Sequence, residues 1–139
     1  MPILDTAVLF AAADRQDKFH ASSRRHLEQG PLGTMLGTFA LVEFDLVLKS
    51  RGYSAEGRSE LMTMLMTDFP MTSSAVHPIS PSTLMVSARL EDKFKLDYFD
   101  ALLAGEAMEL DGAIISSDRE FDAISGLRRI PLVADASHG

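Results

Sequence analysis

Two aspartates stand directly after short apolar segments that are typical of buried strands. Asp5 follows Ile3 and Leu4. Asp118 lies just beyond the apolar run 113–115. In open parallel sheets, ligands bind beyond the carboxyl ends of the strands, where the strand order reverses. Both aspartates are therefore candidates for one shared site, although each could equally serve as a helix N-cap or a turn residue.

Glu43 is an acid on an apolar face of an expected helix. Its neighbours three and four positions away are Phe39, Ala40, Leu46 and Val47. A carboxylate in such surroundings loses hydration energy unless it is paired or coordinates a cation. Glu43 lies five residues after Thr38, about 7.5 Å along the helix axis, so its side chain can point back toward the preceding strand end. The alternative is a buried ion pair with a lysine or arginine.

A further acidic pair stands where a helix is expected to begin. Asp97 and Asp100 are three residues apart and can share one face of that helix. An N-cap followed by an acid in the first turn is an ordinary way to complement the helix dipole. The small residues that follow are Ala101, Ala104, Gly105 and Ala107. They allow close packing, which would bring the acid at the start of this helix into a shared cleft.

Four carboxylates can thus meet at one edge of a sheet: Asp5, Glu43, Asp100 and Asp118. Clustered acids repel one another strongly unless a divalent cation lies among them. A set made only of oxygen ligands suits Mg²⁺ or Mn²⁺ better than zinc, and the 139 residues include no cysteine. Ions of this kind promote the hydrolysis of phosphodiester bonds.

The elements that would position these acids alternate in the manner of an α/β fold with a parallel sheet. Strands are expected at 2–4, 34–37, 76–79, 113–116 and 130–133, the third of them irregular or at an edge because of Pro78. Helices are expected at 6–13, 18–29, 39–49 with Thr38 as N-cap, 56–68 with Ser54 as N-cap, 81–92 and 97–109. Residues 69–75 are expected to form a loop. Residues 1–133 then form one domain, with a frayed tail at 134–139.

Four segments in this order resemble the PIN domain, the nuclease fold of toxins in type II VapBC-type toxin–antitoxin pairs. The segments are Ile3-Leu4-Asp5-Thr6, Thr38-Phe39-Ala40-Leu41-Val42-Glu43, Asp97-Tyr98-Phe99-Asp100-Ala101 and Ser116-Ser117-Asp118-Arg119-Glu120-Phe121. Each string alone is weak, but their acids follow one another at intervals of 38, 57 and 18 residues.

The resemblance implies a three-layer α/β/α domain and a metal-dependent ribonuclease that hydrolyses RNA by in-line attack of water. It carries Asp5, Glu43, Asp100 and Asp118 over as Mg²⁺ or Mn²⁺ ligands or positioners of that water. Thr6 and Ser116 match supporting hydroxyl positions, and Asp97 and Asp122 are additional acids. It further implies an antitoxin partner and a homodimer. The same fold could instead serve RNA maturation, or act as a non-catalytic interaction module.

The overall charge argues against a generic polyanion binder. Asp and Glu number 20 against 13 Lys and Arg, which gives a formal charge of −7. Lys49 and Arg51, which follow Glu43, are the best candidates to guide an RNA backbone, although a solvated surface is the simpler explanation. The methionine-rich segment 62–66 indicates either core packing or an adaptable groove for a partner helix. No targeting or membrane segment is expected, which makes the cytoplasm the default location.

Overall fold

A parallel five-stranded sheet forms the centre of the computed structural model, which describes residues 1–29 and 33–135. The strands are β1 (Ile3–Leu4), β2 (Met35–Gly37), β3 (Val76–His77), β4 (Ala113–Ile115) and β5 (Arg128–Ile130). Their order is β3-β2-β1-β4-β5, and every neighbouring pair is parallel. The chain first extends the sheet on one side of β1 and then on the other. The strand order therefore reverses between β1 and β4.

Burial explains why such short strands hold together. Ile3 and Leu4 of β1 are completely buried, as is Ile114 of β4. Ile3 lies opposite both Met35 and Ile114 in the register. Parallel strands covered by helices on both faces are apolar throughout rather than alternating, and the central strands follow that rule.

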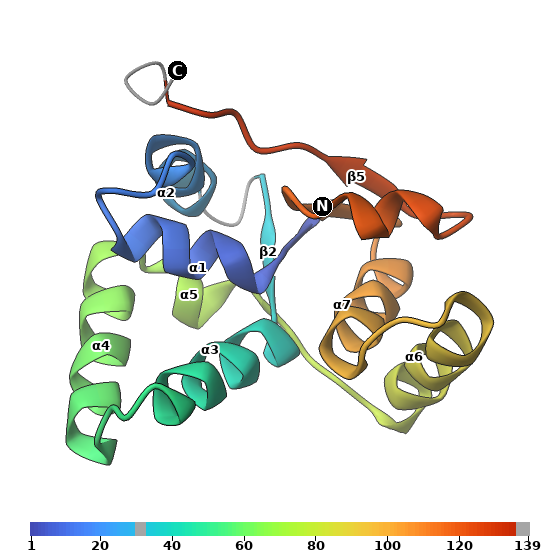
Figure 1. Cartoon of the computed structure of the whole chain (residues 1–139), viewed down its shortest axis with the longest axis horizontal. Helices are drawn as coiled ribbons and strands as arrows, with labels where there is room; N and C mark the ends of the chain where they lie inside the picture. The colour runs from blue at the N-terminus through green and yellow to red at the C-terminus, as the bar shows by residue number, and fades with distance from the viewer. Residues whose placement is uncertain (30–32, 136–139) are drawn as a thin grey trace.

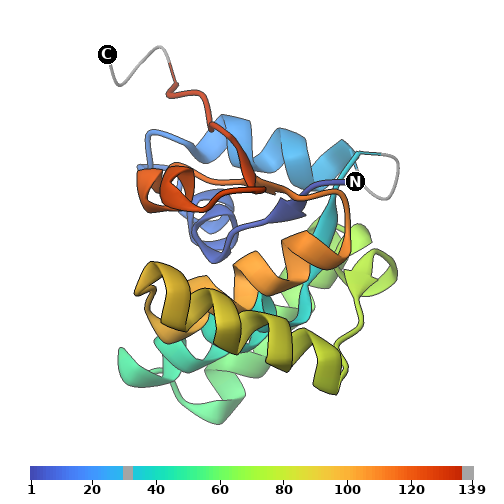
Figure 2. The same cartoon turned by 90° about the vertical axis from the view of Figure 1, so that its right-hand side faces the viewer.

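Helices cover both faces of the sheet. They are α1 (Thr6–Ala13), α2 (His20–Gln29), α3 (Thr38–Ser50), α4 (Ala55–Asp68), α5 (Met71–Ser74), α6 (Pro81–Phe94) and α7 (Tyr98–Glu109), with the 3₁₀ helix η2 (Arg119–Ala123) between β4 and β5. Figure 1 shows α1, α2 and α4 on one side of the molecule and α6 and α7 on the other. In the turned view of Figure 2 the strands lie between α2 and α7, with α6 packed outside α7. The expected three-layer α/β/α architecture is confirmed. Among the described helices, none has both the length and the apolar character to cross a membrane.

Small residues on α7 allow the expected close packing. Ala101, Ala104 and Ala107 are buried, and α7 makes its most extensive contact with α6. Gly105 marks the point of closest approach, because a Cβ atom there would lie 2.0 Å from the Oγ of Ser87. Glycine at this position is thus required by the distance between the helices and not by its backbone angles.

We expect Gly105→Ala to destabilise the protein by about 1–3 kcal/mol, since the added methyl group must push α6 and α7 apart. Urea unfolding followed by circular dichroism measures the change. Gly57→Ala on α4 is the matched control: the added Cβ would lie 3.3 Å from its nearest neighbour, Oγ of Ser54, instead of 2.0 Å, so the stability should change by less than about 1 kcal/mol. Equal stability changes for the two variants would contradict the steric explanation.

Several expected boundaries prove correct and others wrong. The caps Ser54 and Asp97 are confirmed, since their side chains accept hydrogen bonds from the backbone N–H groups of Gly57 and Asp100. Thr38 is not the N-cap of α3. Gly37 occupies that position, and the carboxylate of Glu106 accepts the hydrogen bond of the Thr38 N–H.

The expected strand at 130–133 is wrong: β5 begins two residues earlier, at Arg128, and ends at Ile130, because Pro131 has no N–H to continue the pairing. Residues 71–74 form the short helix α5 instead of a loop. The helix expected from residue 18 begins at His20. In the expected tail, the Asp135 N–H donates to the Lys18 carbonyl, so the chain is held at this point, while residues 136–139 lie outside the described part.

Candidate active site

The carboxyl ends of β1 and β4 supply the first part of the site, at the point where the strand order reverses. Asp5 follows β1, and Ser116 follows β4. The Ser116 hydroxyl, which is completely buried, donates to Oδ2 of Asp5 at 2.6 Å and accepts from the Asp118 N–H at 2.9 Å. One serine therefore ties both strand-end aspartates into a fixed arrangement.

Helix α3 brings Glu43 to the same edge. The hydroxyl of Thr6, at the start of α1, donates a hydrogen bond to Oε1 of Glu43. No lysine or arginine in the described part of the chain forms an ion pair with Glu43. The alternative of a buried ion pair is therefore wrong, and the carboxylate is held by a hydroxyl group that lies next to Asp5.

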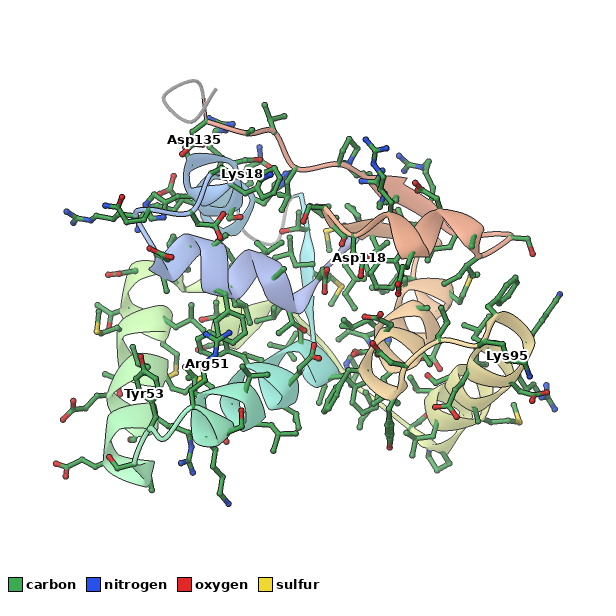
Figure 3. The ribbon with its side chains drawn as sticks, viewed as in Figure 1. Lys18, Arg51, Tyr53, Lys95, Asp118 and Asp135 are labelled. Atoms are coloured by element: carbon green, nitrogen blue, oxygen red, sulfur yellow. The ribbon has the colours of Figure 1, made fainter. Side chains whose placement is uncertain are left out.

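Helix α7 contributes Asp100 from its first turn. Its N–H donates to Oδ1 of Asp97 at 2.9 Å, so Asp97 is the N-cap of α7, as the sequence predicted. Asp100 also belongs to a group in which one carboxylate oxygen from each of Asp100, Asp118 and Glu120 lies within 4.8 Å of the others. In Figure 3 the labelled Asp118 lies near the centre of the molecule, between η2 and α7.

Glu120 is a candidate ligand that sequence reasoning missed. Its N–H donates to Oδ1 of Asp118 at 2.9 Å, and this bond starts the helix η2. The tight turn places the Glu120 carboxylate beside that of Asp118. An acid two residues after Asp118 was the only sequence signal, and it carries meaning only once the 3₁₀ turn is known.

Burial and mutual repulsion raise the pKa values of these acids. Burial is the main cause that raises the pKa of Asp5 to about 6, with Glu43 and Asp118 adding to it, while the Ser116 hydrogen bond opposes the rise. Burial and the charges of Asp97, Asp118 and Asp5 raise the pKa of Asp100 to about 7. Burial also raises the pKa of Glu43, against the hydrogen bond from Thr6. Part of the group therefore retains protons near neutral pH.

The donor set fits a hard divalent cation. All candidate ligands are carboxylate oxygens, which Mg²⁺ and Mn²⁺ prefer. Oxygens bound on opposite sides of a Mg²⁺ ion lie roughly 4.2 Å apart. The 4.8 Å limit among Asp100, Asp118 and Glu120 is thus within reach of small side-chain rotations. A bound cation would also relieve the repulsion that raises the pKa values of Asp5 and Asp100.

A family model matches most of the chain. Residues 3–127 match the family model described as the PIN domain. The chain belongs to the PIN domain family. No curated protein matches this PIN domain by sequence.

Solved structures similar to this PIN domain include FitAcB and two VapBC structures. FitAcB from Neisseria gonorrhoeae has a TM-score of 0.72 at 16% identity and covers 94% of this chain and 96% of its own. DNA-bound VapBC from Salmonella typhimurium has a TM-score of 0.71 at 13% identity, with coverages of 96% and 100%. VapBC2 from Rickettsia felis, bound to a promoter DNA fragment, has a TM-score of 0.68 at 13% identity, with coverages of 93% and 96%. At these identities the likeness establishes the fold.

The remaining expected site residues of the PIN domain lie elsewhere. Asp122 forms an ion pair with Arg129 at 2.9 Å, which lowers the pKa of Asp122. Arg51 lies over the ring of Phe10, 4.9 Å from its centroid, and Lys49 is exposed in the last turn of α3. Figure 3 shows Arg51 beside α1, well away from Asp118. The two basic residues border α1 and α3 but do not contact the acids.

We expect Ser116→Ala to raise the pKa of Asp5 further above about 6, because the variant loses the hydrogen bond that opposes the rise. Carbon-13 NMR titration of the Asp5 carboxyl in the metal-free protein measures the shift. Ser117→Ala is the control, since the Ser117 side chain is exposed and should leave Asp5 unchanged. A pKa of Asp5 that is the same in both variants would show that Ser116 does not stabilise the carboxylate.

Proposed function

We propose that this PIN domain is a Mg²⁺- or Mn²⁺-dependent endoribonuclease and the toxin of a VapBC-type toxin–antitoxin pair. One observation carries the proposal: acids from β1, α3, α7 and β4 meet where the strand order reverses, and burial and repulsion raise the pKa values of Asp5 and Asp100. Such a concentration of carboxylates is costly without a cation. Perturbed pKa values of this kind are typical of functional sites.

Within this proposal the acids have distinct roles. Asp100, Asp118 and Glu120 are the principal ligands, with Asp5 completing the set behind Ser116. A bound divalent ion supplies charge stabilisation at the phosphate and lowers the pKa of water. Thr6 occupies Oε1 of Glu43, which leaves Oε2 to accept a hydrogen bond from the attacking water. Asp97 holds the first turn of α7, and hence Asp100, in place.

Basic residues and bound metal ions together would allow this acidic protein to bind RNA. We assign Lys49 and Arg51 to contacts with the RNA backbone beyond the cleavage site. Two divalent ions would reduce the formal charge from −7 to about −3. Affinity for RNA should therefore be weak in the absence of metal, in contrast to proteins that bind nucleic acid through large basic surfaces.

A groove between α1, α2 and α4 supports the antitoxin part of the proposal. It has a volume of about 200 Å³, and its apolar floor includes Phe44, Leu65 and Phe69, with Met64 at its side. Arg24 lies 4.9 Å from the centroid of Phe69. An apolar groove edged by charged residues suits an amphipathic helix. We propose that an antitoxin segment binds here, that the toxin forms a homodimer, and that it acts in the cytoplasm.

The proposal is tested with a gel assay on total bacterial RNA. Cleavage should require added Mg²⁺ or Mn²⁺ and stop with EDTA. Expression of the unmodified chain in bacteria should arrest growth. If a small reading frame lies next to its gene, co-expression of that frame should relieve the arrest. Binding of Mn²⁺ without cleavage of any RNA would favour a non-catalytic module, and cleavage limited to precursor RNAs without growth arrest would favour RNA maturation.

A further inference from the structure

A buried carboxylate outside the acidic site joins the two helices that carry Glu43 and Asp100. Glu106 on α7 is completely buried. Its Oε1 accepts the Phe39 N–H at 3.0 Å, and its Oε2 accepts the Thr38 N–H at 3.0 Å. Both donors belong to the first turn of α3, so one side chain of α7 caps the start of α3 from 67 and 68 residues away in sequence.

A histidine holds this carboxylate from its other side. Nδ1 of His77, at the end of β3, lies 2.8 Å from Oε2 of Glu106, and Nε2 lies 3.2 Å from Oε2 of Glu109. The carbonyl of His77 in turn accepts the Thr38 hydroxyl at 2.6 Å. The ends of β2 and β3, the start of α3 and the middle of α7 are thereby joined in one hydrogen-bonded cluster.

The local sequence excludes an ordinary cap at this helix. The N-cap position is Gly37, which has no side chain to accept a hydrogen bond. A Cβ atom at Gly37 would lie 2.7 Å from Oε1 of Glu106, so a serine or aspartate cap cannot coexist with the buried carboxylate. Burying an ionisable group is costly, and a local cap would satisfy only one N–H group, that of N2 or N3, whereas Glu106 accepts from both Thr38 and Phe39. The long-range cap therefore calls for a role besides the formation of α3.

The position of Glu106 relative to the site acids indicates what this further role is. Glu43 lies five residues beyond Thr38, about 7.5 Å along α3, and Asp100 lies six residues before Glu106, about 9 Å along α7. Both acids are rigidly connected to the cluster by regular helix. A shift of α3 along α7 would displace the Glu43 carboxylate relative to the Asp100 carboxylate by the same amount.

We propose that Glu106 is a positioning residue, which fixes α3 against α7 so that Glu43 and Asp100 keep the relative placement that metal-dependent cleavage requires. The proposal rests on the nuclease function proposed above. Glu106 contacts neither metal nor RNA and acts only through α3. Displacement of a reacting group by about 1 Å can reduce the rate of a reaction about 100-fold. A small shift of α3 against α7 is therefore enough to slow cleavage.

Glu106→Ala and Glu106→Gln are compared with the unsubstituted protein and with Ser54→Ala. Ser54 caps α4, which carries none of the site acids, so its removal weakens a helix start without affecting the registration of α3. The readouts are the melting temperature, the Mn²⁺ affinity of the metal-free protein by calorimetry, hydrogen exchange at the Thr38 and Phe39 amides, and kcat and KM for RNA cleavage.

We expect Glu106→Ala to lower kcat about 100-fold, with little change in KM or in Mn²⁺ affinity, because the proposed metal ligands are not on α3, and with faster exchange at both amides. Glu106→Gln should be intermediate, because the amide oxygen still accepts one of the two N–H groups. Ser54→Ala should match the unsubstituted protein in kcat and Mn²⁺ affinity.

Wild-type kcat in a folded Glu106→Ala protein would overturn the positioning role, and Glu106→Gln decides the same question if the alanine variant does not fold. Failure of the unsubstituted protein to bind Mn²⁺ or cleave RNA would instead overturn the proposed function.

Discussion

Asp100→Asn is expected to abolish RNA cleavage and, at the same time, to raise the stability of the metal-free protein. Asp100 lies close to several other acids, and its pKa is raised to about 7 by burial and by Asp97, Asp118 and Asp5. Asparagine resembles the protonated form of the side chain. Above neutral pH the substitution removes a negative charge that the neighbouring acids repel. The asparagine amide is also a much poorer metal ligand than a carboxylate.

The two effects of this substitution have opposite signs, which separates a functional acid from a structural one. We expect kcat to fall by about 100- to 1,000-fold, as when other groups that stabilise a transition state are removed. At pH 8 without metal, the melting temperature should rise by roughly 2–4 °C, which corresponds to about 1 kcal/mol after allowance for the half-exposed position of the side chain.

The matched control is Asp92→Asn on α6. Asp92 is exposed and lies 3.6 Å from the Lys95 ammonium group in a surface ion pair. Its replacement should leave both cleavage and melting temperature unchanged. Cleavage by Asp100→Asn at the rate of the control would remove Asp100 from the proposed site. A melting temperature lower than that of the control would show that the carboxylate stabilises the fold instead of being tolerated by it.

The second large effect is a dependence of stability on pH that reverses when metal is added. The pKa values of Asp5 and Asp100 are raised to about 6 and about 7 from an ordinary value of 3.8. Between about pH 4 and 7 the folded protein therefore binds more protons than the unfolded chain. The free energy of unfolding contributed by these groups is fully present below pH 4 and is lost as the pH rises through 7.

Mn²⁺ competes with the same protons. At pH 8 both carboxyl groups are ionised, and Mn²⁺ at 100 times its Kd should stabilise the protein by about 2.7 kcal/mol. At pH 5 the protonated site should bind Mn²⁺ weakly and gain little stability. Cleavage should rise with pH through the same range and level off above 7.

Thermal unfolding with EDTA and with Mn²⁺, at pH 5 and pH 8, measures both parts of this prediction. Double substitution of Asp5 and Asp100 by asparagine should flatten the dependence in EDTA and remove the gain from Mn²⁺. A melting temperature that does not respond to Mn²⁺ at pH 8 would contradict a cation site formed by these acids.

Local patterns were sufficient to predict the fold and the positions of several strands and helix starts. Ile3 and Leu4 before Asp5, and residues 113–115 before Asp118, predict central strands, because continuous apolar runs of this length are buried in parallel sheets. Ser54 and Asp97 predict helix starts because a side-chain cap is formed within three residues. Such interactions depend only on near neighbours in the chain, so they can be deduced without the tertiary structure.

Other features depend on contacts that only the tertiary structure creates. The Thr38 N–H is capped by Glu106 instead of by the threonine side chain, so the expected cap failed. Asp122 pairs with Arg129, which only the return of β5 alongside β4 brings within reach. Glu120 joins Asp100 because η2 turns tightly after Asp118.

The sequence by itself therefore determined which acids and strand ends this PIN domain could use, because residue type and local periodicity decide burial and capping. The tertiary structure decided how those acids are held: Asp5 by Ser116, Glu43 by Thr6, and α3 by Glu106. Each of these hydrogen bonds joins residues more than 30 positions apart. The pKa values of the site follow from the same distances, since burial and repulsion exist only once the elements are packed together.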